Sequence, residues 1–211
     1  MKVEIYSDVA CPWCYIGKRR FESALAAFPS AAEVEVVHRP FLLDPAAPDA
    51  PVPMPLHLER KFGALASSML ARVTDAAAAE GIVMDWDSAL AASTRAAHRL
   101  VLLAGSEYGP EVERRLVDEL FAAYFTRGTD VSDHAALAAL GESVGMEEAR
   151  VREYLASNEG AAELEAELSR ARMVGVTAVP TFVFDGRYAV PGAQPSETFL
   201  EVLEEIRRRA A

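Results

Sequence analysis

The chain has 211 residues, of which 51% are hydrophobic and 25% are charged. This is the ordinary balance of a globular protein that can bury a sizeable core, so the composition excludes a disordered chain. Lys and Arg number 21 and Asp and Glu number 32, which leaves a formal net charge of −11 at pH 7. Phosphate backbones and anionic lipids would repel such a surface, so we expect neither nucleic acid nor a membrane as a partner.

Two short basic clusters interrupt this acidic balance, Lys18-Arg19-Arg20 and Arg207-Arg208-Arg209. Both are better explained as solvated faces or C-terminal ends of helices than as anion-binding surfaces. The N-terminus carries no apolar signal segment, and no run of about 18 apolar residues occurs, so we expect a cytoplasmic protein.

The N-terminal part is predicted to form a strand, a helix and a second strand. Residues 2–7 alternate apolar and polar side chains, as a strand does. A helical pattern then opens at Cys11-Pro12-Trp13-Cys14 and runs to Phe28. Residues 34–38 are rich in β-branched side chains and predict the second strand.

The central part is predicted to be helical. Residues 40–55 contain six prolines, which exclude a helix interior and a central strand, so this segment is interpreted as an extended connector. From Leu56 to about Arg172 the chain is rich in Ala, Leu, Glu and Arg, with glycine stop signals, and predicts five to seven helices.

The C-terminal part returns to strands. Residues 181–184 and 187–190 flank Asp185-Gly186, a pair favoured in type I′ hairpins, and a last helix begins at residues 195–197. The order β-α-β, helical segment, β-β-α predicts an α/β, thioredoxin-like fold with a large all-helical insertion. We assign residues 1–43 and 173–211 to the thioredoxin-like domain and residues 44–172 to the insertion.

Cys11 and Cys14 are the only cysteines, and a pair three positions apart is too small for a structural disulfide framework. A pair that follows a first strand and opens a helix is typical of dithiol chemistry. Cys11 would face the free N–H groups and the positive end of the helix dipole, which favour its thiolate as the attacking group. Cys14, one turn further on, would resolve the mixed disulfide. We therefore expect Cys11 to be accessible and Cys14 to be buried.

Residues around the pair complete the predicted site. Pro12 restricts the turn, and Trp13 offers an apolar flank to the reactive sulfur. Asp8, three residues earlier, would oppose a thiolate if it lies close, whereas Lys18 would favour one. The two charges would therefore act on a thiolate with opposite sign.

Two alternative interpretations of the cysteines are weaker. The thiols could be inert small hydrophobes in a core, or they could be half of a metal site. A zinc site needs further ligands, and the histidines are scattered without paired spacing, at His38, His57, His98 and His134. We therefore expect no metal site.

Val179-Pro180 precedes the predicted strand at residues 181–184. A proline there lies at the start of the strand, where a cis bond would orient it toward the cysteine turn. An ordinary trans proline at a strand end is the alternative.

The chain resembles the DsbA family, and within it the FrnE-like branch of cytoplasmic two-cysteine oxidoreductases. The resemblance spans nearly the whole chain and rests on DVACPWCYIG (8–17), RPFLLDP (39–45), AHRL (97–100), LFAAYFT (120–126), GVTAVPTF (175–182) and GAQ (192–194). It implies a thioredoxin fold with a helical insertion and a redox-active Cys11/Cys14 pair. It also implies a cis bond at Val179-Pro180, in a loop that packs on the cysteines and binds extended substrate through its backbone.

The chain also departs from this family in two places. Relatives often carry asparagine at the start of the segment that leads into AHRL (97–100), where this chain has Ser93. The dipeptide Pro12-Trp13 lacks the histidine of the strongly oxidising periplasmic members, so a milder or a reducing role is open.

Several other residues have a structural and a functional interpretation. His98 could line a cleft or be a hydrogen-bonded helix residue, and we favour the second because no catalytic partner is identifiable. Trp86, Tyr124 and Phe125 are interpreted as core residues.

The sequence therefore predicts a thiol-disulfide oxidoreductase that acts on thiols and disulfides of proteins or small molecules and needs no bound cofactor. Glutathione as a redox partner and a homodimer are left open. One rival is a glutathione-dependent isomerase or transferase, because the fold also resembles kappa glutathione transferases and 2-hydroxychromene-2-carboxylate isomerases, which typically have serine at the position of Cys11. The other rival is a non-catalytic chaperone or adaptor.

Overall fold

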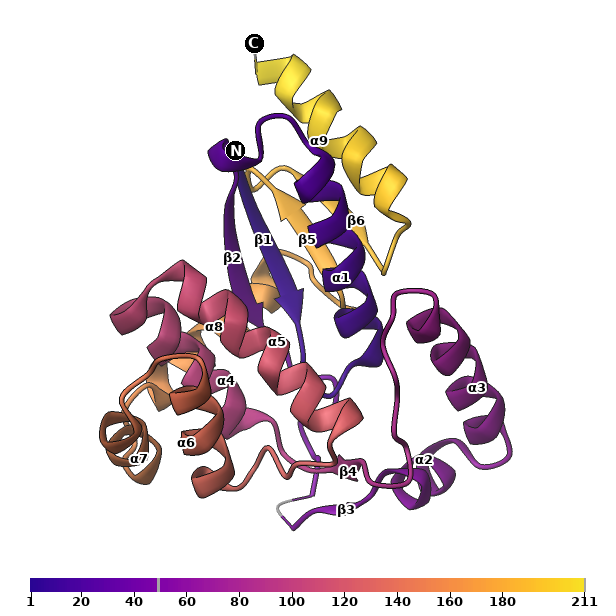
Figure 1. Cartoon of the computed structure of the whole chain (residues 1–211), viewed down its shortest axis with the longest axis vertical. Coiled ribbons are helices and arrows are strands. Elements are labelled where there is room, and N and C mark those ends of the chain that lie inside the picture. The colour runs from indigo at the N-terminus through magenta and orange to yellow at the C-terminus, as the bar shows by residue number, and fades with distance from the viewer. Residues whose placement is uncertain (49, 211) are drawn as a thin grey trace.

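A four-stranded sheet lies at the centre of the protein (Figure 1). The computed structural model describes residues 1–48 and 50–210. The strand order is β2-β1-β5-β6, in which β1 and β2 are parallel and the other neighbours are antiparallel. The strands are β1 (Lys2–Ser7), β2 (Glu35–Pro40), β5 (Thr181–Phe184) and β6 (Tyr188–Pro191). Their order along the chain agrees with the predicted α/β, thioredoxin-like fold.

The helices belong to two groups. The first group packs along the sheet, where α1 (Pro12–Ala27) and α9 (Ser196–Ala210) lie side by side (Figure 1). The second group forms the insertion between β2 and β5. It consists of α2 (Met54–Phe62), α3 (Leu65–Ala78), α4 (Arg95–Leu103), α5 (Pro110–Thr126), α6 (His134–Ser143), α7 (Glu148–Ala156) and α8 (Ala161–Met173). A π-helical turn follows α4, and a short 3-10 turn precedes β2. None of the described helices is both long and apolar enough to cross a membrane.

The insertion differs from the prediction in one detail, because it also contains a short strand pair. β3 (Val52–Pro53) and β4 (Leu90–Ala91) form an antiparallel ladder of two residues each. So short a ladder has no periodicity to detect, and β3 falls in the proline-rich stretch interpreted as a connector. Pro55 lies in the first turn of α2, where a proline lacks no helix hydrogen bond.

The C-terminal hairpin forms as predicted. Asp185 and Gly186 have φ angles of 48° and 65°, the left-handed values that a type I′ turn requires at both central residues. The N–H of Arg187 donates to the carbonyl of Phe184 over 3.0 Å and closes the turn. The side chain of Asp185 accepts a hydrogen bond from the N–H of Lys2, which ties the turn to the start of β1.

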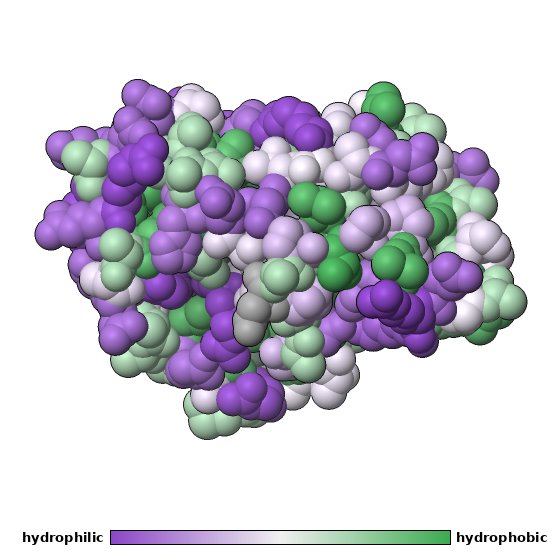
Figure 2. All heavy atoms as spheres, turned by 90° about the horizontal axis from the view of Figure 1, so that it is seen from below, coloured by the Kyte–Doolittle hydropathy of each residue, from purple (hydrophilic) through white to green (hydrophobic). Residues whose placement is uncertain are grey.

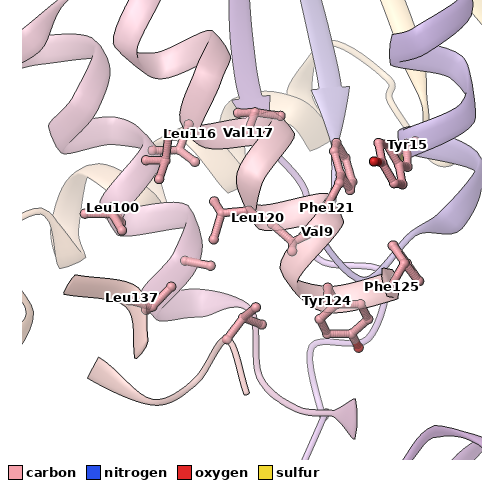
Figure 3. Close-up of a cluster of buried hydrophobic side chains, with 14 of the residues drawn as sticks. Val9, Tyr15, Leu100, Leu116, Val117, Leu120, Phe121, Tyr124, Phe125 and Leu137 are labelled. Atoms are coloured by element: carbon pink, nitrogen blue, oxygen red, sulfur yellow. The ribbon is translucent and has the colours of Figure 1, made fainter. Parts of the chain in front are cut away.

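Two large buried clusters, and a small third one of Tyr6, Ala171 and Val176, form the core. One lies between the sheet, α1 and α9 and is built around Phe21, Phe182, Phe184 and Phe199, whose rings pack edge to face or tilted. The other lies in the insertion, where α5 packs between Leu100 of α4 on one side and Tyr15 of α1 on the other (Figure 3). Tyr15 stacks on Phe121 with ring centroids 5.2 Å apart. Helix α1 therefore contributes to both clusters.

Polar residues and separate apolar groups share the face of the molecule seen in Figure 2. Over the described residues, the exposed large apolar side chains include Leu65, Met69, Val83 and Met173. Scattered exposure of this kind is normal for a globular protein.

Candidate active site around Cys11 and Cys14

The cysteine turn is held by backbone hydrogen bonds. The N–H of Cys11 donates to the carbonyl of Asp8 over 3.0 Å, and the N–H of Cys14 donates to the carbonyl of Cys11 over 3.0 Å. Cys11 is the N-cap residue of α1 in an extended conformation, and Pro12 is the first helical residue, where proline is favoured. Cys11 thus lies at the N-terminal end of α1, where the helix dipole is positive, as predicted.

Both cysteines are free thiols, and both are buried. Cys11 is 3% exposed and Cys14 is 1% exposed. The expectation that Cys14 is buried is confirmed, but the expectation that Cys11 is accessible is wrong. Around them, Val9 and Tyr15 are also buried in the core of the insertion, and Ala10 and Trp13 pack against it. The position of Cys11 at the start of a helix predicts exposure, but side chains of the insertion, which lie far along the chain, cover it.

The pKa of Cys14 is raised well above its ordinary value. Burial is the largest cause, and the neighbouring Cys11 adds to it. A backbone hydrogen bond with Asp8 lowers the pKa, and the negative charge of Asp8 raises it by a smaller amount. Cys14 is therefore held as a thiol in the resting protein, which suits a group that acts only after Cys11 has reacted.

The loop before β5 meets the cysteine turn. The bond between Val179 and Pro180 is cis, as expected. The thiol of Cys11 donates to the carbonyl of Val179 with a sulfur–oxygen distance of 3.7 Å. Pro180 packs on Gly17 of α1, where an added Cβ would lie 3.0 Å from the proline ring. Glycine at position 17 therefore permits the close approach of this loop to the helix.

Trp13 lies half-buried on the other side of the turn and packs against the insertion core. The guanidinium of Arg72, on α3, lies 5.6 Å from the centre of its ring, within the range of a cation–π contact. Helix α3 therefore helps to hold the Trp13 ring in place.

Asp8 forms a buried polar cluster beneath the cysteine turn, which sequence reasoning missed. Asp8 is 1% exposed. Its Oδ1 accepts hydrogen bonds from the N–H of Ala10 over 3.2 Å and from the hydroxyl of Thr94 over 2.8 Å, and its Oδ2 accepts from the N–H of Leu43 over 2.6 Å. Nε2 of His98 lies 3.2 Å from Oδ1. His98 is thus a hydrogen-bonded helix residue, as favoured, but its partner belongs to the cysteine turn.

Lys18 was expected on a solvated helix face, and this is wrong. Its side chain is 3% exposed, and its Nζ lies 2.7 Å from Glu22 and 2.6 Å from Asp118 of α5. Two carboxylates therefore neutralise the cation nearest to Cys14 along α1. Burial of Tyr124 and Phe125 in the insertion core confirms their structural interpretation, and the half-buried Trp86 packs against the same core.

Across residues 1–48 and 50–210, no three His, Cys, Asp or Glu side chains are grouped closely enough to hold a metal ion. Two of the four histidines, His38 and His98, line one small cavity, and the other two lie elsewhere. His38 and His98 are buried, whereas His57 is near Asp44 and His134 begins α6.

Comparison with known proteins gives a consistent family. Residues 2–204 match the DSBA-like thioredoxin domain family. The chain is 39% identical to a probable DsbA oxidoreductase from Streptomyces coelicolor, with a TM-score of 0.90 over 97% of this chain and 89% of that one. It is 25% identical to the protein YwbO of Bacillus subtilis over 98% of both chains. The cytosolic disulfide reductase DsbM from Pseudomonas aeruginosa shares the fold, with 19% identity and a TM-score of 0.66 over the full length of both chains.

Proposed function

Because the chain belongs to the DSBA-like thioredoxin domain family, we propose that it is a thiol-disulfide oxidoreductase with Cys11 as the attacking group and Cys14 as the resolving group. The observation that carries the proposal is the position of the Cys11 sulfur. It lies at the N-terminal end of α1 and 3.7 Å from the carbonyl of Val179, whose following peptide bond to Pro180 is cis. The helix end stabilises a thiolate, and the loop gives a substrate backbone a place to pair.

The exchange proceeds in two balanced steps. The Cys11 thiolate attacks one sulfur of a substrate disulfide, that disulfide breaks, and the departing thiolate takes up a proton. Cys14 then loses its proton and attacks the Cys11 sulfur, which releases the second substrate thiol. The substrate is reduced to two thiols, and the protein is left with a Cys11–Cys14 disulfide. A thiol or dithiol donor reverses both steps on the protein and restores the pair.

Substrate access follows from the burial of Cys11. At 3% exposure, the sulfur can be reached only after neighbouring side chains shift, and this shift is easier to make for a small disulfide than for a folded protein. We therefore propose thiols and disulfides of small molecules or extended peptides as substrates, with glutathione as one candidate redox partner. DsbM has also been solved with GSH, at 18% identity to this chain.

The rival function is a glutathione-dependent isomerase or transferase of the same fold. Such chemistry needs one residue at the helix end and no resolving thiol, whereas this chain carries Cys14 buried directly behind Cys11. The presence of both thiols favours dithiol exchange. We also propose a cytoplasmic location, because a pair of cysteines three apart, without a further structural disulfide, suits a reducing compartment.

Trapping variants test the assignment of roles. We expect Cys14→Ser to accumulate mixed disulfides on Cys11, because the attacking sulfur remains while its resolving partner is gone. Cys11→Ser is the matched control and should accumulate none. Mass spectrometry after incubation with glutathione disulfide and with an oxidised peptide measures both. Equal capture by the two variants would overturn the assignment.

Turnover separates the proposal from its rivals. The wild-type protein should accelerate the reduction of an oxidised peptide by dithiothreitol, and either cysteine variant should lose most of that rate. A non-catalytic chaperone would leave the rate unchanged. An isomerase or transferase would keep its glutathione-dependent activity in Cys14→Ser.

A further inference from the structure

The surroundings of Cys11 restrict which substrates can reach its sulfur. Cys11 is 3% exposed, and its thiol donates to the carbonyl of the half-buried Val179. Trp13, which lies between the two cysteines in the sequence, is also half-buried and packs against the same core. A disulfide that reaches Cys11 therefore carries its remaining atoms past these partly exposed side chains. A charge that lies beside them acts on the substrate.

The cations of α1 that follow the turn are occupied by other contacts. Lys18 binds two carboxylates. Nε of Arg20 lies 2.6 Å from Oε1 of Glu80, which follows the end of α3. Arg19 is exposed and lies over the ring of the buried Tyr15, which stacks on a side chain of α5. None of these three cations contacts Trp13 in the part of the chain that the structure describes.

Arg72 of α3 is the cation that contacts the cysteine turn from the insertion. Its guanidinium carbon lies 5.6 Å from the centre of the Trp13 ring. The residue is exposed, and across residues 1–48 and 50–210 it forms no ion pair with a carboxylate. Even Asp75, three residues later on α3, forms none with it. The positive charge of Arg72 is therefore uncompensated beside the turn.

Helix α3 holds Arg72 in this position. Its Val73 and Ala77 are buried, and the hydroxyl of Thr74 accepts a hydrogen bond from Nε1 of Trp86 over 2.8 Å. The helix also packs directly against α1. A cation–π contact leaves the N–H groups of arginine available to a carboxylate, which they can bind in a bidentate manner. Arg72 is thus a fixed cation with donors to offer.

The net charge of the chain makes this local cation important. At −11, the whole protein should repel anionic substrates and attract cationic ones. Salt screens exposed charges that are farther away than about 8 Å at physiological ionic strength, so the nearest charge has the largest effect on a substrate at the sulfur. Arg72 therefore opposes the preference that the net charge alone would give.

We propose that Arg72 binds the carboxylate of small disulfides and so makes the site selective for anionic substrates. The inference rests on the proposed function and adds its substrate class, which is small disulfides with a carboxylate a few bonds from the sulfur. The alkyl part of such a substrate lies against Trp13. The redox step is unchanged: the dithiol gives two electrons and two protons to the disulfide, which leaves as two thiols, and the Cys11–Cys14 disulfide forms.

Three small disulfides of different charge test the proposal. They are dithiodipropionate, which is a dianion, cystamine, which is a dication, and hydroxyethyl disulfide, which is neutral. The reduced protein is mixed with an excess of each, remaining thiols are alkylated at set times, and mass spectrometry gives the fraction of protein in the disulfide form. The rate constant of each variant is divided by that of the wild-type protein for the same disulfide. Differences in reactivity between the three probes then cancel.

Arg72→Met removes the charge and keeps a flexible side chain that can pack on Trp13. We expect the rate constant to fall at least about fivefold with dithiodipropionate, to change less than about twofold with hydroxyethyl disulfide, and to rise with cystamine. These differences should shrink as the ionic strength is raised from about 0.02 M to about 0.5 M. Arg72→Lys keeps the charge, and we expect it to retain most of the rate with the dianion. An equal fall with all three probes would show that Arg72 only supports Trp13 and would overturn the proposal.

Arg187→Met is the matched control. Arg187 is an exposed arginine of the β5–β6 turn, which bonds to Lys2 at the end of β1 opposite to the cysteine turn. Its loss changes the net charge by the same amount, and we expect unchanged rate constants with all three disulfides. An equal charge-dependent shift in this control, or an unchanged rate with dithiodipropionate in Arg72→Met, would overturn the selectivity alone. A wild-type dithiol that none of the three disulfides oxidises would refute the proposed function as well.

Discussion

Lys18 places a charged side chain in the interior, between α1 and α5. Its ammonium group reaches Glu22 on its own helix and Asp118 on α5, and each of these carboxylates is about a quarter exposed. Removing one partner of a buried ion pair costs about 3–5 kcal/mol when the other charge stays buried. Here the carboxylates remain partly solvated, so the cost is smaller.

We therefore predict that Lys18→Met lowers the free energy of unfolding by about 1–3 kcal/mol, measured by urea denaturation. Arg19→Met is the control, because Arg19 is exposed and its loss should change stability by about 0.5 kcal/mol or less. Equal stability of the two variants would show that the Lys18 contacts are not stabilising.

The residues of the site divide into those that local sequence reveals and those that it does not. Cys11 and Cys14 lie in a short motif at the start of a predicted helix, and Pro180 lies at the start of a predicted strand. The neighbouring residues therefore indicate their positions in the fold. Asp8 and His98 meet across 90 positions, and a scattered histidine and aspartate carry no spacing signal. The burial of Cys11 and Lys18 likewise depends on how the insertion packs, which no local pattern encodes.

Among the elements, α6 shows a side-chain cap. The carboxylate of Asp133 accepts a hydrogen bond from the N–H of Ala136 over 2.7 Å, and so satisfies one of the free donors at the start of the helix. We predict that Asp133→Ala lowers the free energy of unfolding by about 1 kcal/mol.

Asp133→Asn is the matched variant, since asparagine caps helices about as well as aspartate and keeps the acceptor. Thermal or urea unfolding compares the three proteins. The cap has no role if the alanine variant is as stable as the asparagine variant.

At the level of elements, the sequence predicted those that are long or have distinctive ends. β1 and α1 have clear periodicity and a proline start, and the hairpin turn has the Asp185-Gly186 pair that its geometry requires. β3 and β4 were missed because two residues carry no period, and because their pairing joins residues that are 37 and 39 positions apart.

At the scale of the whole molecule, β2 of the sheet packs against α5 of the insertion. Two buried titratable residues lie on these elements, His38 on β2 and Glu113 on α5. His38 is buried with neither ring nitrogen hydrogen-bonded, and burial lowers its pKa to about 3 from 6.5. Burial raises the pKa of Glu113 to about 7 from 4.5.

These shifts act on stability with opposite sign. Between pH 6.5 and about 3 the unfolded chain binds a proton at His38 that the folded chain does not, so stability falls as pH falls. Between pH 4.5 and about 7 the folded chain keeps a proton on Glu113 that the unfolded chain has lost, so stability falls as pH rises. In the overlap the two slopes oppose each other.

We predict that His38→Leu gains stability relative to the wild-type protein as the pH is lowered below 6.5, by up to about 1.4 kcal/mol per pH unit. Chemical denaturation at several pH values measures the difference, and groups that titrate alike in both proteins cancel from it. Glu113→Gln serves as the counterpart and should gain stability as the pH rises from 4.5 to about 7. A difference that does not vary with pH would contradict the assignment.

Helix α1 belongs to two cores, and this limits how the protein can be taken apart. Its C-terminal half, with Phe21 and Ala24, is buried against the sheet, while Cys14, Tyr15 and Ile16 at its start are buried in the insertion. The proposed division into residues 1–43 with 173–211 and residues 44–172 therefore cuts through the surroundings of the reactive sulfurs. Without the insertion, both thiols would lose the side chains that bury them. The thioredoxin-like part thus supplies the two cysteines, and the insertion supplies the side chains that bury them. Neither part alone contains the complete site.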